Sequence, residues 1–567
     1  MNPFESIAAP ILAKFPELDA SDLPFGPAPK IELGDIALPA FLSARKLKGA
    51  PPQVAARIAQ EVAFGPEVQN VTVTGPYINF RLNRGQYARK IVQAILTEGD
   101  RYGSSNEGAG RKALVEHTSI NPNASPHVGR ARNAMIGDAL VRLLRFQGYD
   151  VTVHYYVNDM GRQIALLVLA VDDPEKLTFD EMLDAYVNAN ARSEADPEFK
   201  AKGYDLLAKM EEGDPETARR FHAVTETCLR GQIAVLGRLD IHYDVFDRES
   251  RFLKDPRFEA VLEALREKDA VFVDEDNRLV VDLCKLGWPE RPRDEGRYFV
   301  LMRANGSSMY GYRDLAYTME KMEKGPDLNI AVFGEDHKLY AQQVGLILSA
   351  AGKPFPETVY YSYILLKEGK MSTRKGNVVL LSDFLDEAAS LAGAKVDEQW
   401  PDLPADERRI IAEQIGVGAV RYAILRVGPN RNVTFDWESS LSFTGDTGPY
   451  IQYSCARTAS ILRKFGEVPA ETAEDFPVES DSEWALVMKL ATFPDTVKEA
   501  LTQRDCSPVA QAALDTARLF TTFYHDCPVL AAESEAMRTA RAQLCAAALQ
   551  AQRNALNLLG IKALERM

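Results

Sequence analysis

The clearest pattern in the chain is an alternation of apolar runs and amphipathic stretches between residues 113 and 157. Residues 113–117 form a short apolar run typical of a buried strand. Residues 133–146 carry apolar side chains at helical spacing, Gly148 follows as a stop signal, and residues 151–157 form a second apolar run. A strand, a helix and a strand in this order predict a βαβ unit, and therefore a parallel sheet with a right-handed crossover.

The same kind of pattern continues through the middle of the chain. Residues 270–283 predict a strand pair with a turn at Asp276 and Asn277, and residues 329–348 predict a second strand-to-helix junction, followed by strands in 358–366. The acidic, helical stretch of about 170–215 interrupts this order and is predicted to be an insertion.

The two ends of the chain have different patterns. The N-terminal part predicts an amphipathic first helix, helices over 37–48, 54–63 and 87–96, and strands over 71–75 and 77–82. Beyond about residue 405 only helical patterns occur. We therefore predict an α/β protein with three domains: a small α+β domain (1–106), a parallel-sheet domain with the insertion (107–404) and an all-α domain (405–567).

Composition and cysteine usage narrow the setting of the protein. No apolar run is long enough to cross a membrane, and the N-terminus lacks the basic start of a signal peptide. The six cysteines are scattered without any C-x-x-C pair, which indicates neither a disulfide framework nor a zinc site and favours a reducing cytoplasm.

The net charge of −15 argues against a nucleic acid partner for the chain as a whole. Phosphate contacts need only a local basic patch, however, and two groups of basic residues are candidates. Taken alone, each group fits an ordinary solvated helix face better than a nucleic acid site. The first group is Arg81, Arg84, Arg89 and Lys90, and the second is Arg421, Arg426, Arg431 and Arg457.

The first candidate for chemistry is the turn NPNASPHVGRAR (121–132), between a predicted strand and a predicted helix. Ligands of a parallel sheet bind beyond the carboxyl ends of its strands, where helix N-termini offer free N–H groups. Gly129 would let a phosphate or a flat ring approach the backbone, His127 can donate a hydrogen bond, and Arg130 is a permanent cation. A helix cap with a packed histidine is an equally good interpretation of these residues alone.

The second candidate is the polar loop KMSTRKGN (370–377). Its three cations, two hydroxyl groups and glycine suit a loop that clamps a polyphosphate leaving group. Alone, the loop fits a basic surface turn slightly better, but its occurrence in the same α/β domain as HVGR favours nucleotide chemistry.

The pair HVGR and KMSTRKGN resembles the HIGH and KMSKS signatures of class I aminoacyl-tRNA synthetases. The surrounding residues resemble the arginyl-tRNA synthetases in particular. They include VEHTSINPNASPHVGRARNAMIGD, YYVNDMGRQIA, MYGYRDLAY, GEDHKLYAQQ, FDWESSLSFTGDTGPYIQYSCAR and the final LNLLGIKALERM. The resemblance runs from about residue 33 to the last residue, apart from the acidic insertion.

This resemblance implies that the protein activates arginine with ATP to an adenylate and transfers it to the terminal ribose of arginine tRNA. It implies a Rossmann-like catalytic domain, an N-terminal domain that touches the tRNA D-loop, and a helical domain that reads the anticodon. The expected substrates are L-arginine, arginine tRNA and ATP with loosely bound Mg²⁺. No tightly bound metal or organic cofactor is expected, and the protein is expected to be a cytoplasmic monomer without membrane contact.

The resemblance also implies roles for individual residues. The catalytic and ATP-binding residues are expected to be His127, Gly129, Arg130, Lys370, Met371, Ser372, Arg374 and Lys375, with Gly334 and His337 near the adenine and ribose. The arginine pocket is expected to comprise Glu116, Asn121, Tyr310, Asp314 and Gln343, and Asn158 and Gln163 are expected to line it too. Asp314 is the expected guanidinium partner, because a buried bidentate pair rejects neutral side chains. A helix N-cap at Asp314 and core packing of Tyr310 are the alternatives.

Contacts with tRNA are expected in both outer domains. Tyr77 and Asn79 are expected at the D-loop, where an aromatic ring can stack on an unpaired base. Tyr450, Gln452, Tyr453, Arg457 and Met567 are expected near the anticodon. Core packing within a helix pair is an equally good interpretation of the first four of these residues.

The sequence departs from the family signatures at two positions. Arg130 stands where the second histidine of HIGH is expected, and Thr373 stands where the second lysine of KMSKS is expected. These departures suggest an alternative, a non-catalytic RNA-binding relative, although the complete arginine pocket argues against it. A small nucleotidyltransferase is a third possibility, but it leaves the helical domain without a role.

Overall fold

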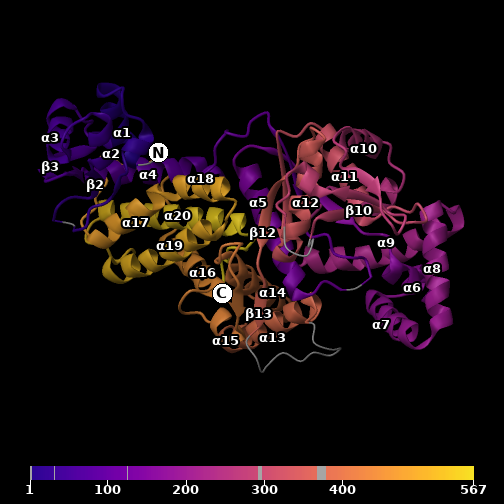
Figure 1. Ribbon diagram of the computed structural model, residues 1–567. Coiled ribbons are helices and arrows are strands. Elements are labelled where there is room, and N and C mark those ends of the chain that lie inside the picture. Colours follow the sequence, from indigo (N-terminus) through magenta and orange to yellow (C-terminus); the bar gives the residue numbers. More distant parts are fainter. Residues whose placement is uncertain (1–2, 31, 124, 291–295, 367–378) are drawn as a thin grey trace.

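The computed structural model describes residues 3–30, 32–123, 125–290, 296–366 and 379–567. Figure 1 shows an N-terminal lobe at one end and the parallel-sheet domain at the other, with the helices of the C-terminal region packed between them. The fold class is therefore the α/β arrangement with flanking α+β and helical parts that the sequence predicts. Within the described residues, no helix is both long enough and apolar enough to span a membrane.

The N-terminal lobe is a four-stranded antiparallel sheet with the order β1-β2-β4-β3, covered by helices. Its elements are α1 (Pro3–Lys14), β1 (Gly26–Pro27), β2 (Ile36–Pro39), α2 (Phe41–Lys46), α3 (Pro51–Glu61), β3 (Val68–Thr74), β4 (Tyr77–Leu82) and α4 (Arg84–Glu98). The prediction of one helix over 37–48 is wrong at its start. Residues Ile36–Pro39 form a strand because their backbone pairs with β4, a partner too distant in sequence for local periodicity to reveal.

The central domain contains a five-stranded parallel sheet with the order β12-β11-β5-β6-β7. The strands are β5 (Lys112–Glu116), β6 (Asp150–Val157), β7 (Val245–Arg248), β11 (Leu328–Gly334) and β12 (Glu357–Tyr361). The helices of this part are α5 (Val128–Phe146), α6 (Arg162–Ala170), α9 (Pro215–Gly237), α11 (Tyr310–Glu323) and α12 (Lys338–Ala350). Strand β6, which follows β5 in the chain, pairs with one edge of β5, and β11 pairs with the other edge. The switch point of the sheet therefore lies between β5 and β11.

Two additions extend this domain. The predicted insertion consists of helices α7 (Phe179–Ala195) and α8 (Pro197–Glu212), which pack on α6 and α9 and project from the molecule (Figure 1). The predicted strand pair is part of a three-stranded antiparallel sheet of β8 (Val271–Val273), β9 (Leu279–Asp282) and β10 (Tyr298–Met302), preceded by α10 (Arg257–Glu267). This small sheet and α10 enclose a separate apolar cluster with α11 and α12.

The C-terminal region is helical apart from one short strand. Its helices are α13 (Leu381–Gln399), α14 (Ala405–Leu425), α15 (Trp437–Ser440), α16 (Gly448–Phe465), α17 (Asp481–Ala491), α18 (Phe493–Gln503), α19 (Ser507–Asp526) and α20 (Glu535–Leu558). The prediction of helices alone beyond residue 405 is therefore corrected. Strand β14 (Val433–Phe435) pairs in parallel with β13 (Ile364–Leu366) and so joins the helical region to the sheet domain.

Candidate active site

The HVGR turn lies at the N-terminus of α5, beside the carboxyl ends of the sheet strands. His127 has an extended backbone and is the N-cap residue, so the helix begins at Val128. The turn is tied to the chain that follows the KMSTRKGN loop, because Val128 N–H donates to Val379 O at 3.1 Å and Leu381 N–H donates to Pro126 O at 2.7 Å. The loop residues Lys370, Met371, Ser372, Thr373, Arg374 and Lys375 themselves lie outside the described residues.

A cavity of about 360 Å³, which we call the turn cavity, opens beside this helix start. His127, Gly129, Arg130 and Gly334 all line it, together with Tyr361 and other residues. A side chain at position 129 would come within 3.0 Å of the His127 ring, so Gly129 keeps the helix start open. Burial and the charge of Arg130 hold the pKa of His127 below its ordinary value, which makes this ring a neutral hydrogen-bonding group near pH 7.

A second cavity, of about 530 Å³, lies at the switch point between β5 and β11. We call it the acidic cavity because Glu116, Glu249, Asp314 and Asp336 line it. Asn121, Asn158, Tyr310 and His337 line it as well. The two cavities share Arg130, Gly334 and Asp336, so a ligand in one would adjoin a ligand in the other at Arg130.

Two of the carboxylates in the acidic cavity already have cationic partners. Buried Lys321 donates to Glu116. Arg313 Nε donates to Glu249 at 2.5 Å, and the Asn158 amide, oriented with its nitrogen toward Glu249, donates to the same carboxylate at 2.7 Å. These two negative charges are therefore neutralised within the protein.

Asp314 differs from both, because its partner is neutral. The Tyr340 hydroxyl donates to it at 2.5 Å, and no cationic nitrogen of the described residues lies within 4.0 Å. Burial raises the pKa of Asp314 to about 6, whereas burial raises that of Glu249 to about 7 despite its arginine partner. Asp336 also has no lysine or arginine partner, but its side chain is half-exposed, so an incoming cation finds in Asp314 the buried carboxylate of this cavity without a cationic partner among the described residues.

The alternatives for Asp314 and Tyr310 do not hold. Met309 is the N-cap residue of α11, and Asp314 lies inside that helix, so it is not a cap. Tyr310 is 52% exposed, which excludes a core role, and its ring packs at 5.1 Å from the Tyr340 ring at the cavity wall.

Two expected pocket residues do not line the acidic cavity. The Gln343 amide is buried and donates to Gly296 O at 3.0 Å. Gln163 instead accepts from Asn123 at 2.9 Å and lines a smaller cavity of about 330 Å³, which it shares with Asn121 and Asn158. Both corrections concern side-chain direction, which sequence spacing does not determine.

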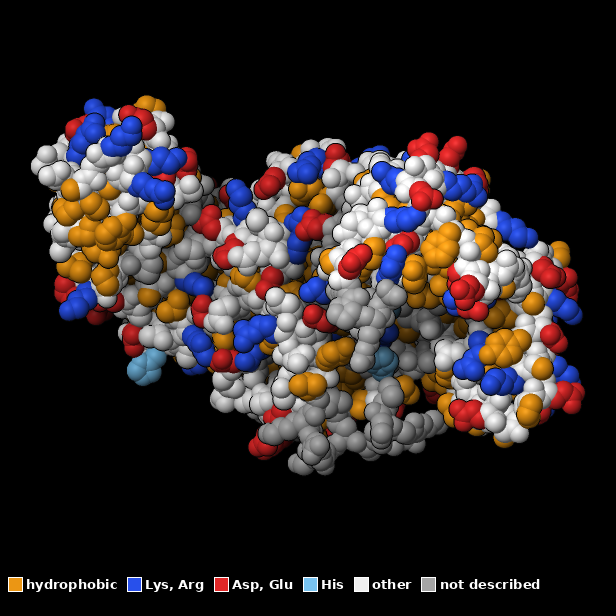
Figure 2. All heavy atoms as spheres, viewed as in Figure 1, with side chains coloured by type: hydrophobic (Ala, Val, Ile, Leu, Met, Phe, Trp, Pro, Cys, Tyr) orange, Lys and Arg blue, Asp and Glu red, His pale blue; other side chains and the backbone are white. Residues whose placement is uncertain are grey.

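On the N-terminal lobe, one of the two expected tRNA contacts is accessible. Tyr77 is 42% exposed and meets Phe41 edge-on at 6.0 Å. Figure 2 shows hydrophobic side chains gathered on this lobe, and Leu42 and Val73 are also exposed there. Asn79, in contrast, is 2% exposed and its amide donates to Thr74, so the expected base contact is corrected for this residue.

In the C-terminal region, the expected anticodon contacts fall into two groups. The Tyr453 side chain is exposed. Arg457 is partly accessible, and its guanidinium carbon lies 4.2 Å from the centroid of the Tyr524 ring. Tyr450 is also partly accessible, and its hydroxyl lies 3.1 Å from that of Thr521. Gln452 and Met567 are buried, and the Gln452 amide donates to Gln414 O and Lys562 O. Core packing therefore describes Gln452, whereas the expected position of Met567 near the anticodon stays a prediction, although its side chain is buried.

The structure also changes the interpretation of the two groups of basic residues. Arg421 is completely buried, so it cannot contact a phosphate in this conformation. Arg84 donates to Asp481 of α17 at 2.7 Å and stacks on Trp484, which makes it a contact between the N-terminal lobe and the helical region. Neither group is therefore a continuous basic patch.

Sequence reasoning missed Glu249, Arg313, Lys321 and Tyr340. Glu249 and Lys321 lie outside the stretches that resemble the family, whereas Arg313 and Tyr340 lie inside MYGYRDLAY and GEDHKLYAQQ but were given no role. Arg313 and Tyr340 lie close in sequence to Asp314 and His337, which is the one signal that pointed toward them.

The site combines a parallel sheet, a helix that starts beside a nucleotide-sized cavity, and an adjoining acidic cavity at the switch point of the sheet. This combination fits the class I aminoacyl-tRNA synthetases. Comparison with known families supports this class. Residues 91–437 match the model of the class I (R) tRNA synthetase catalytic domain, residues 451–567 match the DALR anticodon-binding domain, and residues 5–82 match the arginyl-tRNA synthetase N-terminal domain.

Individual relatives agree with these matches. The chain is 38% identical to an arginine–tRNA ligase of Methanothermobacter thermautotrophicus over 95% of the chain and 94% of the relative. It is 39% identical to an arginine–tRNA ligase of Methanocella arvoryzae over 93% of the chain and 92% of the relative. Arginyl-tRNA synthetase from Thermus thermophilus has a similar structure, with a TM-score of 0.78 at 28% identity and 99% coverage of both chains.

The chain therefore belongs to the arginyl-tRNA synthetase family of class I aminoacyl-tRNA synthetases. Its activity is the ATP-dependent ligation of L-arginine to arginine tRNA, through the adenylate intermediate that is general for class I enzymes. The alternative of a small nucleotidyltransferase does not account for these matches over nearly the whole chain.

Proposed function

We propose that the acidic cavity binds L-arginine, with Asp314 as the partner of the guanidinium group. The observation that carries this proposal is the charge balance of the cavity: Glu116 and Glu249 each have a cationic partner, and Asp314 has only the Tyr340 hydroxyl. A guanidinium group can donate two parallel hydrogen bonds to such a carboxylate. Glu116 and Asn121, at the end of β5 and just beyond it, are proposed to bind the α-amino group.

The turn cavity is proposed to hold ATP. Gly129 leaves the backbone at the helix start open to the phosphates, and Gly334 and His337, at the end of β11 and just beyond it, suit the adenosine. Mg²⁺ is proposed to arrive with ATP as part of the substrate. Lys370, Met371, Ser372, Arg374 and Lys375 are proposed to act on the pyrophosphate end, because the chain that follows them is tied to the His127 turn.

The proposed reaction occurs where the two cavities meet. An oxygen of the arginine carboxylate attacks the α-phosphorus, a new phosphorus–oxygen bond forms, and the bond to the pyrophosphate oxygen breaks with its electron pair. Arg130 lines both cavities, so its positive charge can reduce the repulsion between the arginine carboxylate and the phosphate. Neutral His127 is proposed to donate a hydrogen bond to a phosphoryl oxygen without proton transfer.

The same proposal covers the rest of the chain. We propose that residues 1–106 form the D-loop-binding domain with Tyr77 as the stacking residue, and that residues 107–404 form the catalytic domain. Residues 405–567 are proposed to read the anticodon with Tyr450, Tyr453 and Arg457. The protein is proposed to act as a cytoplasmic monomer without membrane contact, and sedimentation of the enzyme with and without tRNA checks the monomeric state.

A comparison of arginine with citrulline tests the proposed pocket. Citrulline has nearly the same shape, but a neutral urea replaces the guanidinium group. In ATP–pyrophosphate exchange with saturating arginine tRNA, we expect arginine to be favoured by roughly 10⁴-fold in kcat/KM, the discrimination typical of a buried polar site whose partner is missing. A preference below tenfold would mean that the cavity does not recognise the charge of the substrate.

A further inference from the structure

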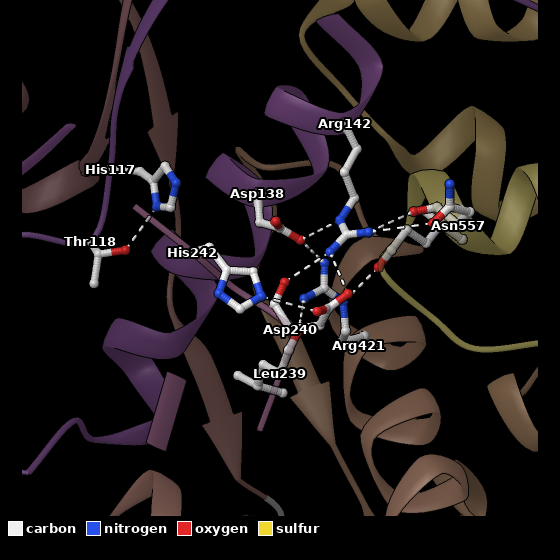
Figure 3. Close-up of polar contacts among 10 residues, drawn as sticks. His117, Thr118, Asp138, Arg142, Leu239, Asp240, His242, Arg421 and Asn557 are labelled. Atoms are coloured by element: carbon white, nitrogen blue, oxygen red, sulfur yellow. Dashed lines mark hydrogen bonds and ion pairs between the residues drawn. The ribbon is translucent and has the colours of Figure 1, made fainter. Parts of the chain in front are cut away.

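Helix α5 runs from the candidate active site to the C-terminal region, and a buried ion pair is among the contacts that join it to that region. The helix begins at the His127 turn, and Asp138 lies in its middle. Arg421 of α14 donates to Asp138 at 2.5 Å, and Arg142 donates to the same carboxylate at 2.8 Å (Figure 3). Arg421 is completely buried, so its charge depends on this carboxylate for neutralisation.

The other bonds of Arg421 reach the end of the chain. Its Nε donates to Leu559 O at 2.6 Å, and its Nη1 donates to Leu239 O at 2.7 Å. Leu559 is the C-cap residue of α20, and Gly560 follows with φ of +66°. A side chain at Gly560 would come within 2.2 Å of the guanidinium, so the last segment is shaped around Arg421.

The opposite face of α5 holds the segment that follows β5. The Asn133 side chain accepts from Thr118 N–H at 2.7 Å and donates to Val332 O at 2.9 Å, which fixes it between β5 and β11. Gly137 leaves room for the buried His117 ring, because a side chain at that position would come within 2.2 Å of the ring. Asn133 and Gly137 therefore connect α5 to the wall of the acidic cavity, within about one and a half helical turns of Asp138.

That wall has a strained backbone. Thr118 and Ser119 have φ of +82° and +45°, and both line the acidic cavity. A β-branched residue rarely adopts a positive φ, and such a conformation persists only where the surroundings hold it. The surroundings here are Asn133, the His117 ring at 2.8 Å from the Thr118 hydroxyl, and the Tyr243 hydroxyl at 2.6 Å from it.

We propose that Asp138 and Arg421 are positioning residues through which the C-terminal domain sets the shape of the arginine cavity. A shift of α14 or of the end of α20 moves α5 through the buried ion pair. Asn133 transmits this movement to Thr118 and Ser119. Binding of tRNA to the C-terminal domain therefore changes the affinity for arginine, and by linkage arginine changes the affinity for tRNA by the same factor. The inference rests on the proposed arginine cavity.

A second ion pair of α14, the helix that carries Arg421, provides a matched control. Arg238, at the end of α9, donates to Glu413 of α14 at 2.9 Å and to Asp386 of α13 at 2.8 Å. It joins the sheet domain to α14 as Arg421 does, but Glu413 and Asp386 lie on α14 and α13 and not on α5. Loss of this pair loosens the domain contact without releasing the helix that carries His127.

The test is the affinity for arginine, measured by calorimetry with and without a saturating transcript of arginine tRNA. We expect tRNA to change the arginine Kd of the wild-type enzyme at least about fivefold, the lower end of typical coupling between sites. In Asp138→Asn and Arg421→Lys the ratio should fall below about twofold, whereas Arg238→Met should keep the wild-type ratio. A wild-type ratio of one, an unchanged ratio in the first two variants, or an equal loss in Arg238→Met would overturn the proposal.

Thr118→Gly tests the other end of the same connection and leaves the buried ion pair intact, should the first variants not fold. Glycine adopts the observed φ without strain, so its backbone no longer depends on α5. We expect an arginine Kd that tRNA does not change, and a wild-type ratio in this variant would contradict the proposal. Failure of the arginine cavity itself is distinguishable, because Asp314→Asn would then leave arginine binding intact with and without tRNA.

Discussion

Replacement of Asp314 by asparagine removes one negative charge from the acidic cavity and leaves its shape almost unchanged. The amide still accepts the hydrogen bond of the Tyr340 hydroxyl, which lies 2.5 Å from Asp314. Because Glu116 and Glu249 have their own cationic partners, neither can replace Asp314 as the partner of a guanidinium group without breaking a buried ion pair. The variant therefore tests one interaction.

The expected magnitude follows from the burial of this pair. Removal of one partner from a buried ion pair costs roughly 3–5 kcal/mol. At about 1.4 kcal/mol for each tenfold change, this corresponds to an increase in the arginine KM of roughly 150-fold or more. The KM of ATP should change less than about threefold, because ATP is assigned to the turn cavity, which Asp314 does not line.

The assay is ATP–pyrophosphate exchange at saturating arginine tRNA, with arginine varied. Asp336→Asn is the matched control, because Asp336 lines the same cavity but has a half-exposed side chain beside His337. We expect that control to change the arginine KM less than about threefold. An increase below fivefold in Asp314→Asn, or an equal increase in Asp336→Asn, would refute the assignment of the guanidinium partner.

Three further predictions concern pH, Arg130 and Tyr77. Burial raises the pKa of Asp314 to about 6, and a cation binds the ionised form of this carboxylate. The arginine KM should therefore rise as pH falls through 6 and stay constant above about pH 7. Steady-state kinetics from pH 5 to 8 would show this bend, and Asp314→Asn should abolish it. Arg130→Met should lower the kcat of ATP–pyrophosphate exchange about 100-fold, as expected for loss of one transition-state donor, while Arg130→His stays within about tenfold of the wild type in the same exchange assay. Tyr77→Ala should raise the tRNA KM about fivefold or more through loss of one stacked base, without changing the arginine KM, and an unchanged tRNA KM in aminoacylation would exclude the stacking role.

The sequence predicted those parts of the fold that depend on local patterns. The βαβ unit of β5, α5 and β6, the strand pair at Asp276 and Asn277, and the helical insertion all follow from the spacing of apolar residues. Strand β2 did not follow from that spacing, because Ile36–Pro39 is too short for a period and becomes a strand through its pairing with β4.

The candidate site was predictable where a motif fixes the position of a residue along the chain. His127, Gly129, Arg130 and Gly334 meet in one cavity, as the resemblance implies. The direction and burial of a side chain depend on distant partners, and this explains the corrections. Arg421 has the sequence context of a basic helix face, yet it is buried against Asp138, which lies 283 residues away in the chain. Glu249 belongs to no motif and enters the cavity through the fold alone.

A crystal structure with a non-hydrolysable arginyl-adenylate analogue tests the central assignment most directly. We predict that both terminal nitrogens of the guanidinium group lie within about 3.2 Å of the Asp314 carboxylate oxygens. The adenosine should lie beside Gly129 and Gly334, and the phosphate mimic should lie next to Arg130. A guanidinium group bound to another carboxylate, or an adenosine outside the turn cavity, would contradict the account.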